Sequence, residues 1–164
     1  MAWSRDEIKA RILADHGAWR ALLARVEPGW MDEPGPMGEW SFKDLVSHLL
    51  AWRNRMVDRV EAAAAGRPRP ANPWPAGMNE DDPINAWFRD RDAPRSAAEL
   101  VAAYDGSFDR LAGALESLPT STSFADGGTA GYFRWTDANG EIESDFFGHL
   151  GDHVADVDSW LARR

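Results

Sequence analysis

The chain has 164 residues, 44% of them hydrophobic, and a formal net charge of −9. This size predicts one domain over residues 1–164 with a substantial core. The acidic balance argues against nucleic acid as a partner, because that binding depends on neutralising phosphates, although Arg53, Arg55 and Arg59 could form a local basic patch.

The chain contains no cysteine, which excludes disulfides, thiolate metal ligands and cysteine nucleophiles. No apolar run reaches the roughly 18 residues that a membrane span requires. We therefore expect a cytoplasmic protein without a membrane partner. Nine tryptophans are the unusual part of the composition, and they belong either to the core or to the walls of a cavity or interface.

The first predicted helix begins at Ser4, which forms an S-x-x-E capping box with Glu7. Apolar residues then recur with a period near 3.6, so the helix should extend to about Val26. Three prolines and three glycines follow, and residues 28–38 should therefore form a loop.

Ser41 should cap a second helix that ends near Gly66. Residues 66–82 are rich in proline, which predicts an irregular crossing. A short helix should then begin at Asp82 and Pro83 and close before Pro94.

The third long helix should start with the capping box of Ser96 and Glu99 and end at Pro119. Residues 120–140 are rich in glycine, threonine and aspartate, so we expect a long loop with a small hairpin. The fourth helix should start near Glu141 and run to the end of the chain.

Four long amphipathic helices in one domain predict an all-α four-helix bundle. The connection between the second and third long helices is long and contains a short helix. Such a crossover allows these two helices to run parallel instead of forming a hairpin.

Three of the four histidines fall on apolar helix faces. His149 and His153 are separated by four residues, so both side chains lie on one face of the last helix. His48 lies on the inward face of the second helix. Three imidazoles from two helices can bind one divalent metal ion and leave a coordination position open, which is the pattern of catalytic sites.

Acidic residues near these histidines could accept hydrogen bonds from the imidazole rings. Asp44 and Asp145 each lie one turn before a histidine, and Asp145 is the first candidate for a general base. Asp152 and Asp156 should face solvent. The candidates for pocket walls are Trp52, Asn85, Trp87 and Tyr104, with core packing as the alternative for Tyr104.

A different interpretation of the histidines is that they are hydrogen-bonded residues of a core or an interface. Three unpaired buried imidazoles would each cost on the order of 1–3 kcal/mol, and a shared metal would remove most of that cost. The fourth histidine, His16, should lie near the solvent edge of the first helix and has no such pattern.

Residues 38–52 resemble the signature W-[ST]-x-K-[DE]-x-x-x-H-[LI] of the DinB/YfiT-like superfamily. Residues 148–161 are similar to the H-x-x-x-H helix of that superfamily. The middle of the chain resembles its ClbS/DfsB branch through Trp74-Pro75, Asp82, residues 84–87, Arg91 and residues 107–111.

This resemblance implies an up-down-down-up four-helix bundle that is often a homodimer. It also implies a zinc, nickel or iron ion on His48, His149 and His153. Some superfamily members are transferases or isomerases that use bacillithiol, mycothiol or glutathione, and the ClbS/DfsB branch is associated with self-resistance to an electrophilic genotoxin.

Two reactions suit an open three-histidine site acting on a small electrophile in detoxification or stress. The metal could supply hydroxide for hydrolysis, or it could hold a thiol as thiolate for transfer. Without cysteine in the chain, that thiol would be a low-molecular-weight cosubstrate. The alternatives are a bundle that binds or sequesters a small molecule without catalysis, and a dimeric scaffold.

Overall fold

The computed structural model describes residues 2–125 and 146–164, and helices dominate this part of the chain. The long helices are α1 (Arg5–Leu23), α2 (Phe42–Ala64), α4 (Ala97–Glu116) and α7 (His149–Leu161), and a shorter helix is α3 (Asp81–Asp92). The mainly helical class predicted from the sequence is thereby confirmed.

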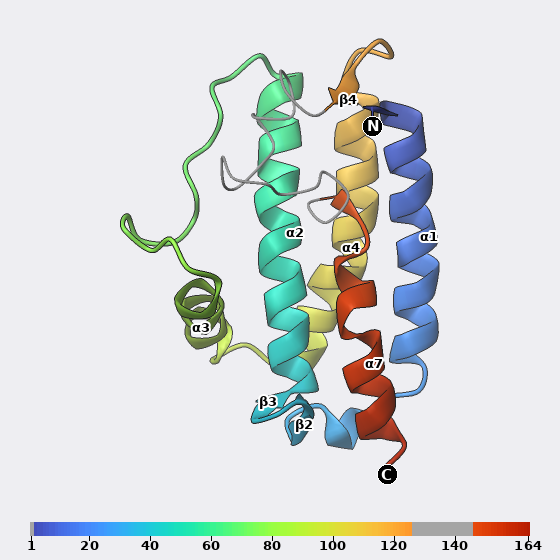
Figure 1. Cartoon of the computed structure of the whole chain (residues 1–164), viewed down its shortest axis with the longest axis vertical. Coiled ribbons are helices and arrows are strands. Elements are labelled where there is room, and N and C mark those ends of the chain that lie inside the picture. Colours follow the sequence, from blue (N-terminus) through green and yellow to red (C-terminus); the bar gives the residue numbers. More distant parts are fainter. Residues whose placement is uncertain (1, 126–145) are drawn as a thin grey trace.

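The long helices lie side by side, and α3 sits outside them next to α2 (Figure 1). In this view α1 and α7 run toward the end of the molecule that holds the C-terminus, whereas α2 and α4 run away from it. The crossing from α2 through α3 returns the chain to the start of α4, so α2 and α4 run in the same direction.

Three serines start three of these helices in the same way. Ser4, Ser41 and Ser96 each accept a hydrogen bond from the backbone three residues later, and the acid at that position binds back to the serine N–H. These reciprocal bonds satisfy N–H groups that a helix start otherwise leaves without partners. The predicted starts of α1, α2 and α4 are therefore confirmed.

Within residues 2–125 and 146–164, four short strands lie at the ends of the long helices. β1 (Ala2–Ser4) pairs antiparallel with β4 (Ser123–Ala125), with Trp3 opposite Phe124. β2 (Pro34–Met37) pairs antiparallel with β3 (Trp40–Ser41). These pairings join the start of the chain to the segment after α4, and the α1–α2 connection to the start of α2.

The α1–α2 connection differs from the predicted loop. α1 ends at Leu23 rather than near Val26, and a 3₁₀ turn, η1 (Pro28–Trp30), and the β2–β3 pair follow it. The turn between the strands contains Gly38, whose φ of 67° is a left-handed conformation that suits glycine. Strands of two to four residues are too short to produce a periodic pattern in the sequence.

The last helix also differs from its prediction. A continuous helix from about Glu141 is wrong within the described residues, because the chain bends at Phe147 and Gly148 and α7 begins only at His149. Gly148 has a φ of 86°, which a right-handed helix cannot contain. Residues 126–145, which include most of the predicted long loop and hairpin, lie outside the described residues.

The main core lies between α1, α2, α4 and α7. Its largest fully buried side chains include Trp19, Phe42, Tyr104 and Phe108. A second and smaller core holds α3 against α2 through Ala51, Trp74, Ile84 and Phe88.

The arginines of α2 do not form a basic surface patch, because Arg53, Arg55 and Arg59 are all buried. Asn72 Oδ1 accepts hydrogen bonds from Arg55 Nε and Arg59 Nη2. The described part of the chain contains no helix with the length and apolar character of a membrane span.

Candidate metal centre

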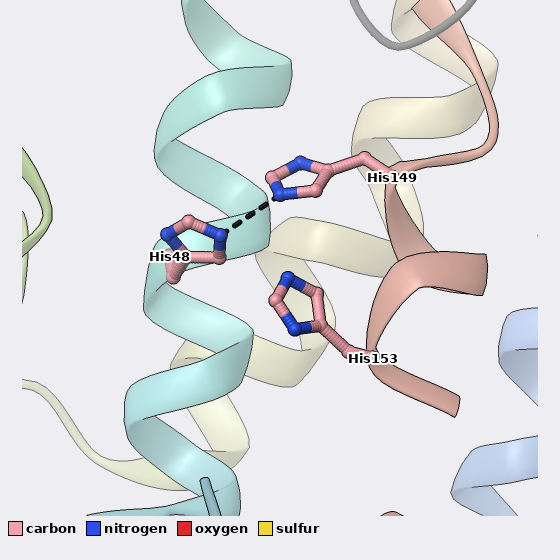
Figure 2. A group of neighbouring side chains, drawn as sticks. All are labelled: His48, His149 and His153. Carbon is pink, nitrogen blue, oxygen red and sulfur yellow. Dashed lines mark hydrogen bonds between the residues drawn. The ribbon is translucent and has the colours of Figure 1, made fainter. Parts of the chain in front are cut away.

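The three histidines of the sequence pattern come together between α2 and α7 (Figure 2). One ring nitrogen from each of His48, His149 and His153 lies within 4.8 Å of those of the other two. The Nε2 atoms of His48 and His149 are 2.8 Å apart. His48 comes from the middle of α2, whereas His149 is the first residue of α7 and His153 follows one turn later.

These donors fit a divalent metal ion. Bonds of about 2.0–2.1 Å in a tetrahedral site place neighbouring nitrogens about 3.3 Å apart, which falls between the 2.8 Å pair and the 4.8 Å limit of the cluster. His153 Nε2 is buried and has no hydrogen-bond partner among the described residues. Imidazole donors suit zinc, nickel, copper and iron.

Burial keeps the three imidazoles neutral. It lowers the pKa of His48 from 6.5 to about 4, with a smaller contribution from the charge of His153. Burial also lowers the pKa of His149 well below its usual value and lowers the pKa of His153. For His153, the carboxylates of Asp152 and Asp156 act in the opposite direction. Neutral rings have the lone pair that a metal ligand needs.

Asn85 holds the outer side of the His48 ring. Its Oδ1 lies 3.0 Å from His48 Nδ1 and accepts a hydrogen bond of 2.9 Å from Trp52 Nε1. The expectation that Asp44 supports His48 is wrong, because Asp44 Oδ2 is bound to the backbone N–H and hydroxyl of Ser41 in the cap of α2. Asp145, the candidate base, lies outside the described residues.

The start of α7 is attached to two other helices. The N–H of Gly148 donates a hydrogen bond of 2.8 Å to Asp15 Oδ2 on α1. Arg53 Nη1 of α2 donates one of 3.2 Å to the carbonyl of Phe146. The Arg53 guanidinium lies 4.4 Å from the centre of the Phe108 ring. Its positive charge also lowers the pKa of His149, although burial and the other two histidines have larger effects. These contacts place His149 against α2.

A cavity of about 360 Å³ lies beside the cluster. His48 and His153 form part of its wall, and the face of α3 that carries Asp82, Asn85 and Arg89 forms another part. The remaining lining residues are Met37, Trp40 and Ala86. The guanidinium of Arg89 lies 5.3 Å from the Trp40 ring centre. The cavity therefore offers apolar surface and one charged group of each sign.

The predicted pocket residues are not all in this cavity. Asn85 lines it, whereas Trp52 and Tyr104 line a second, smaller cavity with His149. Trp87 is partly buried and packs against Phe88 and the guanidinium of Arg91.

The predicted site lacks five residues of the cavity wall: Met37, Trp40, Asp82, Ala86 and Arg89. Arg89 follows Asn85 by four positions, so the helical period of α3 could have placed it on the same face. Trp40 is the tryptophan of the W-[ST]-x-K-[DE] signature, but no helical period places it in the cavity wall, because its position depends on the short β2–β3 pair.

The fourth histidine has a structural environment of its own. His16 is buried, contrary to its predicted place near solvent, and its ring stacks on Phe108. His16 Nε2 lies 2.8 Å from Asp105 Oδ1, and Arg20 donates two hydrogen bonds to the same carboxylate. The hydrogen bonds from Arg20 have the largest effect on Asp105 and, together with His16, lower its pKa to about 2, although burial acts in the opposite direction. His16 is thus separate from the three-histidine cluster.

The helical fold and the three-histidine cluster define the chain as a DinB-like domain. Residues 12–136 match the family described as the mycothiol maleylpyruvate isomerase N-terminal domain, and the chain belongs to this family. No curated protein and no solved structure matches the chain significantly. The matched segment contains His48 but ends before His149 and His153, so the grouping of all three rests on the structure.

Proposed function

We propose that this chain is a metal-dependent enzyme that acts with a low-molecular-weight thiol on a small electrophilic molecule. The observation that carries the proposal is the convergence of His48, His149 and His153 with a buried His153 Nε2 that lacks a partner among the described residues. The proposal of a thiol cosubstrate is based on the name of the matched family, which refers to mycothiol.

The three histidines would hold a zinc, nickel or iron ion. Such an ion lowers the pKa of a thiol or water that it binds, so a nucleophile becomes available near neutral pH. Since the chain has no cysteine, the thiol has to enter from solution. The cavity beside His48 and His153 is the proposed place for the small molecule.

The residues of this cavity would orient the substrate. Arg89 can bind an anionic group, Asp82 can bind a cationic group or accept a proton, and Trp40 with Met37 offers apolar contact. Asp145 remains our first proposed general base because it precedes His149 by four residues. Asp82 is the second, since it lines the cavity. The variants Asp145→Asn and Asp82→Asn would separate the two, because only loss of the base should abolish the acidic limb of the rate profile.

Finer features of the resemblance belong to the same proposal. The helix directions in Figure 1 support an up-down-down-up bundle. Membership of the ClbS/DfsB branch, a role in detoxification or self-resistance, and a homodimer are proposed from the resemblance alone. Light scattering on the purified protein tests the dimer.

The second candidate function is a bundle that binds a small molecule without turnover. The apolar part of the 360 Å³ cavity favours it, because Trp40 and Met37 could retain a ligand without any reaction. It predicts binding that does not depend on a thiol.

The test begins with metal content. Protein purified without a histidine tag is measured by mass spectrometry of its metals and by titration calorimetry with Zn²⁺ and Ni²⁺. We expect one ion per chain in the wild type, loss of that ion in His153→Ala, and retention in the control His16→Gln, whose histidine lies outside the cluster. Equal, sub-stoichiometric metal in wild type and His153→Ala would contradict the metal site.

The reaction is tested on the loaded protein with mycothiol and a model electrophile. Turnover that requires both the thiol and the three histidines supports the transferase or isomerase. Metal binding without thiol-dependent turnover would instead favour hydrolysis or the non-catalytic binder.

A further inference from the structure

We infer that Asn85 is a positioning residue which, oriented by Trp52, fixes the His48 ring with its hydrogen on Nδ1 and its lone pair on Nε2. The metal ligand atom of His48 is thereby set before any ion arrives. The value of this device for metal binding rests on the proposed function, whereas the tautomer itself does not.

The indole of Trp52 identifies the oxygen of the Asn85 amide. The indole N–H of Trp52 is a donor and has no acceptor capacity. The amide atom that lies 2.9 Å from it must therefore be the oxygen and not the NH₂ group. The opposite orientation of the amide would bring two donors together. Trp52 thus decides which end of the Asn85 amide faces α2.

The Asn85 oxygen in turn fixes the position of the ring hydrogen of His48. The same Asn85 oxygen lies 3.0 Å from His48 Nδ1, and an amide oxygen can only accept. His48 Nδ1 must carry the hydrogen and donate it. An imidazole that binds a metal is neutral, so the other nitrogen of such a ring, Nε2, holds the lone pair, and it points toward His149 and His153.

The tautomer of His48 also determines the role of the His149 ring. If His48 Nε2 is an acceptor, then His149 Nε2, 2.8 Å away, has to be the donor in the metal-free protein. His149 would therefore change its tautomer when an ion replaces this hydrogen bond, while His48 would keep its own. Metal binding would therefore require a change of tautomer in His149 but not in His48.

The packing of α3 explains why Asn85 can impose this choice. Ile84 and Phe88, which flank Asn85 on α3, are fully buried against Ala51 and Trp74. The amide consequently sits on a docked helix and not on a free loop. Residues that orient a metal-binding histidine in this way typically contribute 10–100-fold to metal affinity.

The experiment measures tautomers in metal-free protein labelled with ¹⁵N on histidine, by long-range ¹H–¹⁵N correlation NMR. We expect His48 of the wild type to be the Nδ1–H form. Asn85→Asp should preserve that form, because a carboxylate still accepts both hydrogen bonds. Asn85→Ala should lose the preference, and Trp52→Phe should weaken it, because the amide can then rotate. Asn79→Ala, a matched substitution at an exposed asparagine, should change nothing.

Zinc titration of the same variants provides the second readout. We expect a loss of about 10–100-fold in affinity for Asn85→Ala, with affinity close to wild type for Asn85→Asp and Asn79→Ala. A wild-type His48 in the Nε2–H form, or an unchanged tautomer in a folded Asn85→Ala, would overturn the inference. Failure of the metal proposal is a different result, because wild type would then bind no zinc while its tautomers remain measurable.

Discussion

His48 and His149 are 101 positions apart in the chain, yet their Nε2 atoms lie 2.8 Å from each other. The contact exists only when the start of α7 packs against the middle of α2. Both attachments of that start, Gly148 to Asp15 and the Phe146 carbonyl to Arg53, are also long-range. Metal binding at this site is therefore expected to be linked to folding.

Removal of the metal should lower the stability of the protein. An ion at 100 times its dissociation constant adds about 2.7 kcal/mol to the free energy of unfolding. For a chain of this length that corresponds to roughly 5–10 °C in Tm. Thermal unfolding with zinc and with EDTA measures the difference. His153→Ala should show no difference between the two conditions, and an equal shift in this variant would place the stabilising ion elsewhere.

The stability of the metal-free protein should fall as the pH falls from about 6.5 toward 4. The pKa of His48 is about 4 in the folded protein and 6.5 without the effect of burial. Between these values the unfolded chain binds a proton that the native state does not, so unfolding becomes more favourable at lower pH. At pH 5 the loss from His48 is about 2 kcal/mol.

Urea unfolding in EDTA at pH 5 and pH 7.5 tests this dependence. His149 and His153 have pKa values lowered in the same direction, so they should add to the slope. His48→Gln should have a shallower dependence than wild type. Asp105, with a pKa of about 2, acts only below pH 4 and does not interfere. The same slope in His48→Gln and wild type would show that His48 is not the cause.

Gly35→Ala should destabilise the protein by about 1–3 kcal/mol. A Cβ at Gly35 would overlap the indole ring of Trp160, which stacks on Phe42 at the start of α2. The substitution has to displace either β2 or the end of α7. Chemical denaturation measures the loss. Gly29→Ala is the matched control, because a Cβ there has no neighbour within 4 Å and its backbone φ is not positive.

Two glycines next to the histidines of α7 should respond in opposite ways to alanine. Gly148 has a φ of 86°, so Gly148→Ala should cost about 1–2 kcal/mol although its surroundings are open. Gly151 lies inside α7 with open space around it, and Gly151→Ala should stabilise by about 0.5–1 kcal/mol. Denaturation curves of both variants decide this, and the same sign in both would contradict the bend at Gly148.

The features that the sequence predicted correctly depend on short spacings. The capping boxes at Ser4, Ser41 and Ser96 involve residues three apart, and the helical period brings His149 and His153 to one face. Such relationships are set by helix geometry alone. For the same reason the inward direction of His48 could be predicted from its apolar neighbours.

The features that could not be predicted from the sequence depend on how separate helices and strands pack against one another. Asp44 is the acidic residue nearest to His48 in the sequence, but its carboxylate accepts hydrogen bonds from Ser41 in the cap of α2. The partner of His48 is instead Asn85, which comes from another helix. No spacing rule gives the position of α3 on α2. The bend at Gly148 was missed because apolar residues on both sides continue the helical pattern across it.

Because α3 packs separately from the main bundle, it should open locally at a lower free energy than α2, although both helices contribute to the site. This helix is held by its own small core around Ile84 and Phe88 and by a 2.9 Å hydrogen bond from Ser47 to Asp92. Its amides should therefore exchange with deuterium through openings of lower free energy than those of α2. Each such opening would remove Asn85 and admit water to His48 while the rest of the bundle stays folded.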